Sequence, residues 1–176
     1  MDATSVFQDA FGRMPDLVSA AVDGLDEAAL THRIDPDANT IAWLVWHLTR
    51  VQDDHLAGAA AALGWDTMTD QVYAAGFAER FDLPFDVGAV GYGQSSDEVA
   101  AVRASPELLL DYHAAVHART TDVLAAVRAD EWATVVDERW DPPVTLLARV
   151  SSVLGDVTQH VGQAAYVRGV VERSTT

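Results

Sequence analysis

The sequence predicts an all-α protein, a four-helix bundle with a long connection between its second and third helices. Four long segments repeat apolar residues at helical spacing, and stretches rich in glycine, proline and acidic residues separate them. Helices that each present one apolar face pack around a shared core as a bundle. The length of 176 residues suits one core, so we expect a single domain over residues 1–176.

The first two helices are expected over about residues 4–23 and 41–63. In the first, apolar residues recur at helical spacing as far as the turn signal of Gly24. In the second, Asn39 or Thr40 can cap the exposed backbone N–H groups. The apolar positions of the first helix are Phe7, Phe11, Met14, Leu17, Val18 and Val22.

The second predicted helix carries two stripes of side chains. One stripe is apolar, and the other joins Trp43, His47 and Asp54 at helical spacing. A helix with two such faces needs packing partners on both of them, so we expect it to be well buried.

Residues 64–95 form a long connection of a different character. Glycines and a proline interrupt every helical period, while aromatic residues recur along it. A long connection within a compact domain is more often functional than idle, and its aromatic residues indicate that it packs onto the bundle. Gly88, Gly91 and Gly93 lack the strand-to-helix context and the lysine of a phosphate-binding loop.

The remaining elements follow from capping and turn signals. A short helix is expected over about residues 95–103, with a capping box at its start. A third long helix is expected over about residues 105–129, with Pro106 at its first helical position. Residues 130–143 are expected to be extended or turn-like, and Trp132, Val135, Val136 and Trp140 could form a short β-hairpin before the last helix, which spans about residues 145–171.

Charge and cysteine content argue against several classes of function. The formal net charge is −16 and all 11 basic residues are arginine without a cluster, which disfavours nucleic acids and anionic membranes as partners. No apolar run is long enough to cross a bilayer, and the N-terminus lacks a secretory signal. Without cysteine, the chain has no disulfide and no thiol nucleophile of its own. We therefore expect a cytoplasmic protein that acts on a small molecule, as a monomer or a homodimer.

A candidate metal site combines the second and last helices. His47 lies on the stripe of Trp43 and Asp54, and Asp156 and His160 lie one helical turn apart near the C-terminus. Two groups at i,i+4 face the same side of a helix and can bind one ion, with a third ligand from another helix. Two histidines and one carboxylate leave coordination positions open, as in catalytic sites. The alternative is that both histidines are core-edge residues satisfied by hydrogen bonds.

A second histidine pair competes with this site. His113 and His117 also stand at i,i+4, on the third helix, and from the residues alone they are as plausible a chelating pair. Their alternative interpretation is one buried and one solvated histidine. Tyr166 and Arg168, shortly after His160, are candidates for contact with a cosubstrate, or a surface pair that covers the helix end.

Four motifs occur in order along nearly the whole chain. They are residues 40–48 (TIAWLVWHL), 53–55 (DDH), 140–144 (WDPPV) and 159–169 (QHVGQAAYVRG). In these motifs the chain resembles the DinB-like superfamily. Within it, the chain is similar to the actinobacterial branch of mycothiol-dependent transferases, which is related to the metal-binding domain of mycothiol-dependent maleylpyruvate isomerase.

The resemblance implies a four-helix bundle that holds a divalent ion, such as zinc or nickel, on three side chains, commonly three histidines. His47 and His160 match two of these ligands, and Asp156 stands where many relatives have histidine. The resemblance therefore favours this set over the pair on the third helix. A carboxylate in place of an imidazole shifts the preference towards harder ions or zinc.

Three functions are consistent with such a site. The resemblance implies a metal-dependent thiol S-transferase or isomerase, with mycothiol as cosubstrate and a small electrophile as substrate. A metal-bound thiol loses its proton near neutral pH, and the lack of cysteine fits a thiol supplied from outside. Asp54 is a candidate base, or a residue that orients the surroundings of His47. The alternatives are a metal-dependent hydrolase with an activated water and a non-enzymatic stress protein that binds a metal or a small apolar ligand.

Overall fold

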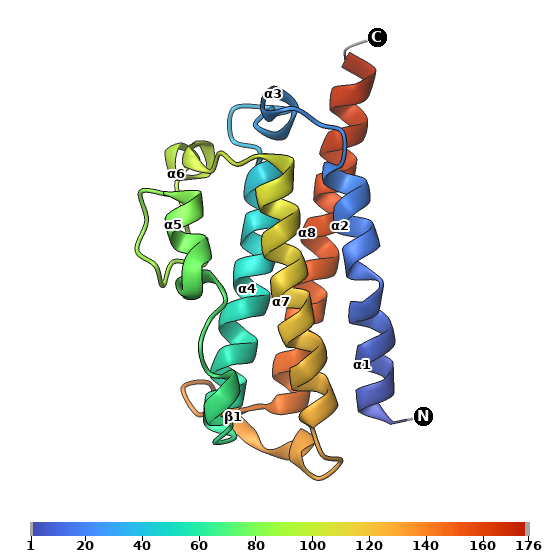
Figure 1. The fold of residues 1–176 in the computed structure, drawn as a ribbon, viewed down its shortest axis with the longest axis vertical. Coiled ribbons are helices and arrows are strands. Elements are labelled where there is room, and N and C mark those ends of the chain that lie inside the picture. Colours follow the sequence, from blue (N-terminus) through green and yellow to red (C-terminus); the bar gives the residue numbers. More distant parts are fainter. Residues whose placement is uncertain (1, 175–176) are drawn as a thin grey trace.

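The computed structural model describes residues 2–174 as a helical bundle with one small hairpin. The elements, in order, are α1 (Ala3–Gly12), α2 (Met14–Val22), α3 (Glu27–Leu30), α4 (Ile41–Ala62), the single turns η1 (Asp66–Met68) and η2 (Tyr73–Phe77), α5 (Ala78–Phe81), α6 (Ser96–Ala101), α7 (Pro106–Ala126), the turn η3 (Glu131–Ala133), β1 (Val135–Asp137), β2 (Val144–Thr145) and α8 (Leu146–Ser174). Four helical arms lie side by side: α1 with α2, then α4, α7 and α8 (Figure 1). This arrangement confirms the predicted fold class. In the described part of the chain, no helix is both long and apolar enough to cross a membrane.

The first arm of the bundle is two helices and not one, which corrects the prediction over residues 4–23. α1 and α2 meet at Arg13, and Pro15 lies in the first turn of α2. Proline lacks the N–H that would donate to the carbonyl four residues earlier, that of Phe11. The helix therefore breaks and restarts with proline where no backbone donor is needed. Leu17 shares the predicted apolar spacing but is 45 % exposed.

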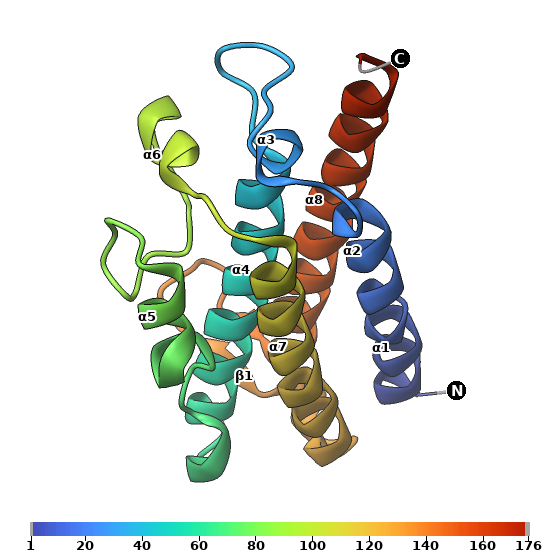
Figure 2. The ribbon, with the colours of Figure 1, turned by 45° about the horizontal axis from the view of Figure 1, so that its top comes forward.

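α4 is the central helix of the bundle. Thr40 caps it by accepting a hydrogen bond from the backbone N–H of Trp43 (3.0 Å). α7 and α8 pack along it, and the segment with α5 lies on the side that faces away from α2 (Figure 2). Every residue from 41 to 53 is buried, as expected for a helix that packs on two faces.

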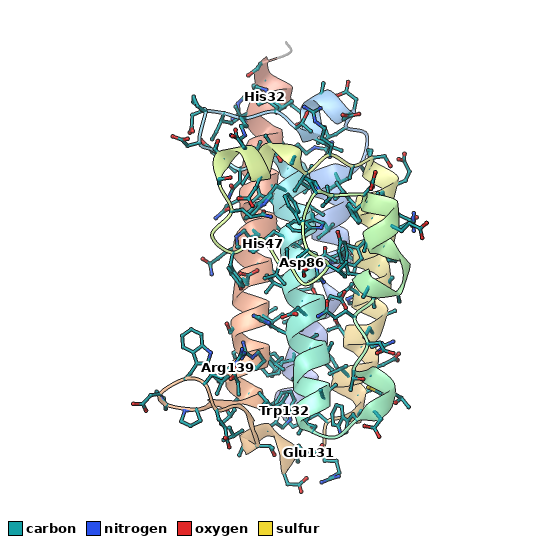
Figure 3. All side chains as sticks on the ribbon, turned by 90° about the vertical axis from the view of Figure 1, so that its left-hand side faces the viewer. His32, His47, Asp86, Glu131, Trp132 and Arg139 are labelled. Atoms are coloured by element: carbon teal, nitrogen blue, oxygen red, sulfur yellow. The ribbon has the colours of Figure 1, made fainter. Side chains whose placement is uncertain are left out.

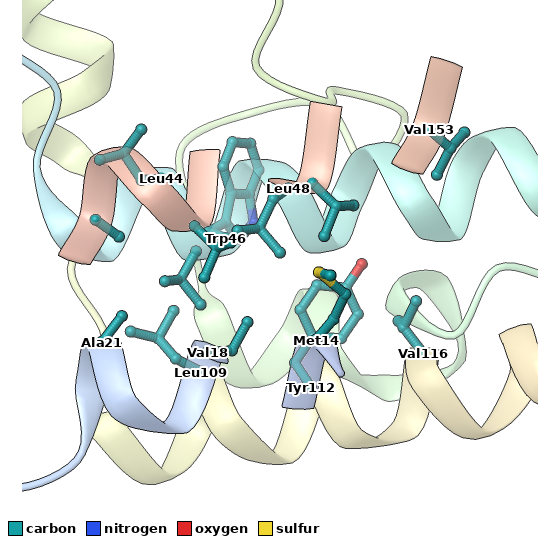
Figure 4. Close-up of a cluster of buried hydrophobic side chains, with 14 of the residues drawn as sticks. Met14, Val18, Ala21, Leu44, Trp46, Leu48, Leu109, Tyr112, Val116 and Val153 are labelled. Carbon is teal, nitrogen blue, oxygen red and sulfur yellow. The ribbon is translucent and has the colours of Figure 1, made fainter. Parts of the chain in front are cut away.

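The hydrophobic core fills the space between the four arms. Side chains from α2, α4, α7 and α8 meet in its centre (Figure 4). Full burial of a large apolar side chain contributes about 1.5–3 kcal/mol relative to exposure, so these contacts are the main source of the bundle's stability. The labelled core residues are Met14, Val18, Ala21, Leu44, Trp46, Leu48, Leu109, Tyr112, Val116 and Val153.

A buried ion pair ties the long connection to α4. Arg50 is 0 % exposed, and its guanidinium donates to the carbonyls of Val87 and Ala89 (3.2 and 3.1 Å). Asp53, 3.5 Å from that guanidinium, accepts from the backbone N–H groups of residues 72–73 (2.9 and 2.8 Å). The connection is therefore anchored at two points, which confirms that it packs onto the bundle.

A short β-hairpin precedes α8. β1 and β2 pair antiparallel, with Val135 opposite Thr145 and Asp137 opposite Val144. The hairpin confirms the expectation for this stretch, although its second strand begins only after the two prolines. Trp140 lies between the strands and is 64 % exposed. α8 begins directly where β2 ends and runs beyond its predicted end.

Candidate metal centre

His47 projects from the middle of α4 towards α8 and has aromatic rings on two sides. The indole of Trp43, one turn earlier, stacks on the imidazole with centroids 4.5 Å apart and an interplanar angle of 11°. The ring of Tyr92 meets it edge-on at 5.2 Å. The Nδ1–H of His47 donates to the carbonyl of Val90. Nε2 therefore keeps its lone pair and faces the side chains of α8.

α8 presents Asp156 and His160 one turn apart on the face that meets α4. The Nδ1–H of His160 donates to the backbone carbonyl of Asp156 (2.8 Å), so its Nε2 also keeps a lone pair. The imidazoles of His47 and His160 approach to 4.7 Å between centroids and are nearly perpendicular, at 73°. An imidazole held through one nitrogen by a carbonyl is oriented to ligate a metal through the other.

The three side chains form one cluster across two helices. One ligand atom each from His47, Asp156 and His160 lies within 4.8 Å of the others, and His47 Nε2 is 4.0 Å from Asp156 Oδ2. Asp156 Oδ1 is buried, lies 3.4 Å from His160 Nδ1 and accepts no hydrogen bond from residues 2–174, which is costly for a carboxylate unless a cation compensates it. Two imidazole nitrogens and one carboxylate oxygen suit zinc and similar divalent ions. The cluster can therefore hold a metal ion, with coordination positions left open.

Electrostatics within the cluster favour a positive charge between the imidazoles. Burial lowers the pKa of His47, because the imidazolium would lose its hydration. The side chain of Asp156 raises the pKa of His160. The carboxylate thus attracts a cation, and a metal ion on two neutral imidazoles competes with the proton for this place.

The long connection supplies a part of the site that the sequence analysis missed. Gly91, at φ +102°, brings the backbone so close that a Cβ on it would lie 2.5 Å from His47 Nδ1. The same Cβ would lie 3.2 Å from the rings of Trp43 and Trp46. Only glycine allows this approach, and the approach brings the carbonyl of Val90 to the imidazole. A glycine within an aromatic connection was the available signal, but the sequence does not show which side chain it approaches.

Asp54, predicted as a base or as a residue near His47, lies outside the three-residue cluster. It follows His47 by two helical turns, and its carboxylate accepts from Gln71 Nε2 (2.8 Å) and His55 Nδ1 (3.0 Å). The hydrogen bond from His55 lowers the pKa of Asp54. Its role in a reaction stays a prediction. Tyr92 lies between His47 and the pair of Asp54 and His55, because its ring contacts His47 and also stacks on His55 at 6.4 Å.

Tyr166 and Arg168, predicted to contact a cosubstrate, lie further along α8. Arg168 donates to the carbonyls of Ala20 and Asp23 (2.9 and 2.8 Å) at the end of α2, where the helix dipole favours a cation. Tyr166 is 64 % exposed and lines a groove of about 400 Å³ beside Gln163. The structure places both residues outside the cluster.

The competing pair on α7 finds no third ligand among residues 2–174. His113 is 2 % exposed and its Nε2 has no hydrogen-bond partner within these described residues, whereas His117 is half-buried. Their rings stack at 6.3 Å. Burial lowers the pKa of His113 to about 4, so it is a neutral core side chain at physiological pH. The geometry favours the His47 cluster as the place for a metal.

Comparisons with known proteins agree with the helical architecture. A crystal structure of a conserved protein of a locus from Enterococcus faecalis superposes with a TM-score of 0.84 at 26 % sequence identity. The match covers 97 % of this chain and 98 % of the other. A search of curated proteins returned no match. The family profile of the DinB superfamily matches residues 10–164, which is most of the chain, and the protein therefore belongs to the DinB superfamily.

Proposed function

We propose that this protein binds a divalent metal ion on His47, Asp156 and His160 and thereby activates the thiol of a small cosubstrate towards an electrophile. The observation that carries the proposal is the convergence of three ligand atoms from two helices within 4.8 Å. Both imidazoles use Nδ1–H for a backbone carbonyl, which leaves both Nε2 lone pairs for an ion. Three protein ligands leave positions for a substrate, whereas a structural site uses four. When bound, a divalent ion lowers the pKa of a coordinated thiol, so that the thiolate forms near neutral pH.

The chain's own residues orient and shield this site. The carbonyls of Val90 and Asp156 hold the two rings through their Nδ1–H groups. Trp43 and Tyr92 cover two sides of His47. Exclusion of water on these sides strengthens the attraction between the ligands and a cation. Because the sequence contains no cysteine, the reacting thiol has to come from a cosubstrate.

The resemblance to mycothiol-dependent transferases makes mycothiol the first thiol to test. The same open positions also suit an activated water, as in a hydrolase. The two reactions differ in one requirement, because a transferase or isomerase of this kind turns over only when the thiol is present.

The first experiment loads metal-free protein with Zn²⁺ or Co²⁺. We expect about one ion per chain. Removal of a ligand in His160→Ala should abolish most of the affinity, while the matched variant His113→Ala should retain it. Mycothiol should produce a thiolate-to-metal absorption band on the cobalt protein. The metal-loaded protein should also accelerate the conjugation of mycothiol to monochlorobimane.

Two results would contradict the proposal. One is wild-type protein that takes up no divalent ion. The other is a pair of variants in which His113→Ala loses the metal and His160→Ala keeps it, which would move the site to α7. Metal-dependent turnover of a substrate without any thiol would show that the protein is a hydrolase and not a thiol transferase.

A further inference from the structure

A polar cavity opens along the groove between α4 and α8, below the metal cluster. It has a volume of about 300 Å³, and its charged and polar lining includes Asp54, His55, Asp137, Arg139 and Arg149. These residues come from α4, α8 and the hairpin. Figure 3 shows His47 at the seam of the two helices and Arg139 further down the same side of the molecule.

Asp54 on α4 and Arg149 on α8 lie at the same level along the groove. Asp54 follows His47 by seven residues on α4, and Arg149 precedes Asp156 by seven residues on α8. The two helices run in opposite directions (Figure 1), so both shifts point the same way along the groove. Seven helical residues rise about 10 Å, and this is the separation between the cluster and the cavity along the helices.

Tyr92 spans the distance between the two places. Its ring meets His47 edge-on at 5.2 Å and stacks on His55 at 6.4 Å. The side chain is 60 % exposed. A molecule that reaches from the cluster to the cavity therefore passes along an aromatic wall.

The carboxylates of the cavity are engaged, whereas its guanidinium groups have donors to spare. Asp137 accepts from Arg139 Nε and Nη2 (both 2.9 Å) and from Arg149 Nη2 (2.7 Å). Both oxygens of Asp54 also accept hydrogen bonds. Among the described residues, Arg149 donates only through Nη2, which leaves the N–H groups at Nε and Nη1. Two arginines share one carboxylate, so this trio carries a net positive charge.

We propose that this cavity binds the anionic end, a carboxylate, of a molecule whose sulfur occupies the metal cluster. The inference rests on the metal-bound thiol proposed above and adds a substrate class to it, thiols that end in a carboxylate; mycothiol, whose cysteine carboxyl is bound in an amide, lies outside this class. Arg149 is the recognition residue, because its side chain is only 15 % exposed and guanidinium donors bind carboxylates through strong, directed hydrogen bonds. Asp54 and the exposed Glu138 add negative charge to the lining, so recognition depends on these directed donors and not on net charge.

The test compares thiols that differ in length and charge on the Zn²⁺-loaded protein, with calorimetric affinity as the readout. ω-Mercaptooctanoate and ω-mercaptooctanol span about 10 Å when extended, the rise of seven helical residues, whereas ω-mercaptopentanoate and ω-mercaptopentanol are too short to reach the cavity and too long to close a stable chelate ring on the metal. We expect the long acid to bind roughly ten-fold more tightly than the long alcohol, and the short acid and alcohol to bind alike.

Two variants assign the effect. Arg149→Met keeps an apolar stem of similar length and should abolish the preference for the long acid without changing the affinity for the alcohols. Arg103→Met removes an exposed arginine that pairs with Glu27 elsewhere. It changes the net charge equally and should leave the preference intact.

The outcomes separate this inference from the function on which it rests. If none of the thiols binds the metal-loaded protein, the proposed function fails and the inference with it. If thiols bind but acid and alcohol bind alike, or if the preference survives in Arg149→Met, the anion subsite is overturned while thiol binding stands. A preference lost equally in Arg103→Met belongs to overall charge and overturns the subsite as well.

Discussion

The orientation of the His47 imidazole depends on the backbone carbonyl oxygen of Val90. It also requires glycine at position 91, because a side chain there would collide with the imidazole. The bond from Nδ1 to the carbonyl determines which ring nitrogen faces α8. Hydrogen-bond partners of a metal ligand typically change metal affinity by about 10- to 100-fold when they are lost. A residue without any ligand atom is therefore part of the site.

Gly91→Ala should lower the affinity for Zn²⁺ by about 10- to 100-fold. The added Cβ would lie 2.5 Å from His47 Nδ1, so the loop or the imidazole has to move. The measurement is a competition with a chromophoric chelator at fixed pH. Gly93→Ala is the matched control, because Gly93 also has a positive φ (+73°) but, apart from its chain neighbours, no described residue has an atom within 4 Å of the added Cβ. Equal losses in both variants would assign the effect to backbone strain in the loop.

At the scale of elements, α4 and α8 supply the ligands and the long connection orders one of them. Arg50 follows His47 on α4 and binds the carbonyls of Val87 and Ala89, immediately before Val90. The buried pair of Arg50 and Asp53 therefore anchors the connection and also places the carbonyl that orients His47. The same buried ion pair therefore determines both the packing of the long connection and the geometry of the metal site.

Asp53→Ala should destabilise the fold by about 3–5 kcal/mol, because it leaves the Arg50 guanidinium buried without its carboxylate. Urea unfolding measures the loss, and hydrogen exchange should show residues 71–91 opening first. Asp111→Ala is the control, since it breaks an exposed pair with Arg80 of 2.8 Å and should cost no more than about 1 kcal/mol. Similar losses for both substitutions would mean that the buried pair contributes no more than a surface pair.

At the scale of the whole molecule, His113 is a buried core histidine that opposes stability in acid. His113 is buried between the arms of the bundle, and its Nε2 has no hydrogen-bond partner in the part of the chain that the structure describes. Burial lowers its pKa from 6.5 to about 4. Between these two values the unfolded chain binds a proton that the folded protein does not. The free energy of unfolding therefore falls as the pH drops from 6.5 towards 4.

His113→Leu should remove this part of the acid sensitivity. The expected difference is about 3 kcal/mol between neutral pH and the folded-state pKa, at about 1.4 kcal/mol per pKa unit. Urea unfolding of wild type and variant at both ends of this range measures it. His32→Leu, in an exposed loop, should follow the wild-type curve. Parallel curves for wild type and His113→Leu would show that His113 does not titrate on unfolding.

Most of the helices could be predicted because their signals are local. The capping box of Ser95 and Glu98 and the start of α7 at Pro106 occur as expected, since each is set by residues within one turn. The break at Arg13 also had a local signal, Pro15, but the apolar spacing continues across it and hid the interruption.

The sequence by itself determined the helical arms, the spacing of Asp156 and His160 on one face of α8, and the lack of a thiol in the chain. These properties follow from composition and from the 3.6-residue period of the helix. Only the tertiary structure decided that His47 meets that pair, that a carbonyl 43 positions away orients its ring, and that Arg149 opens into the same groove. Such contacts join residues far apart in sequence, and their distance is set by how the helices and the connection pack, which local periodicity does not encode.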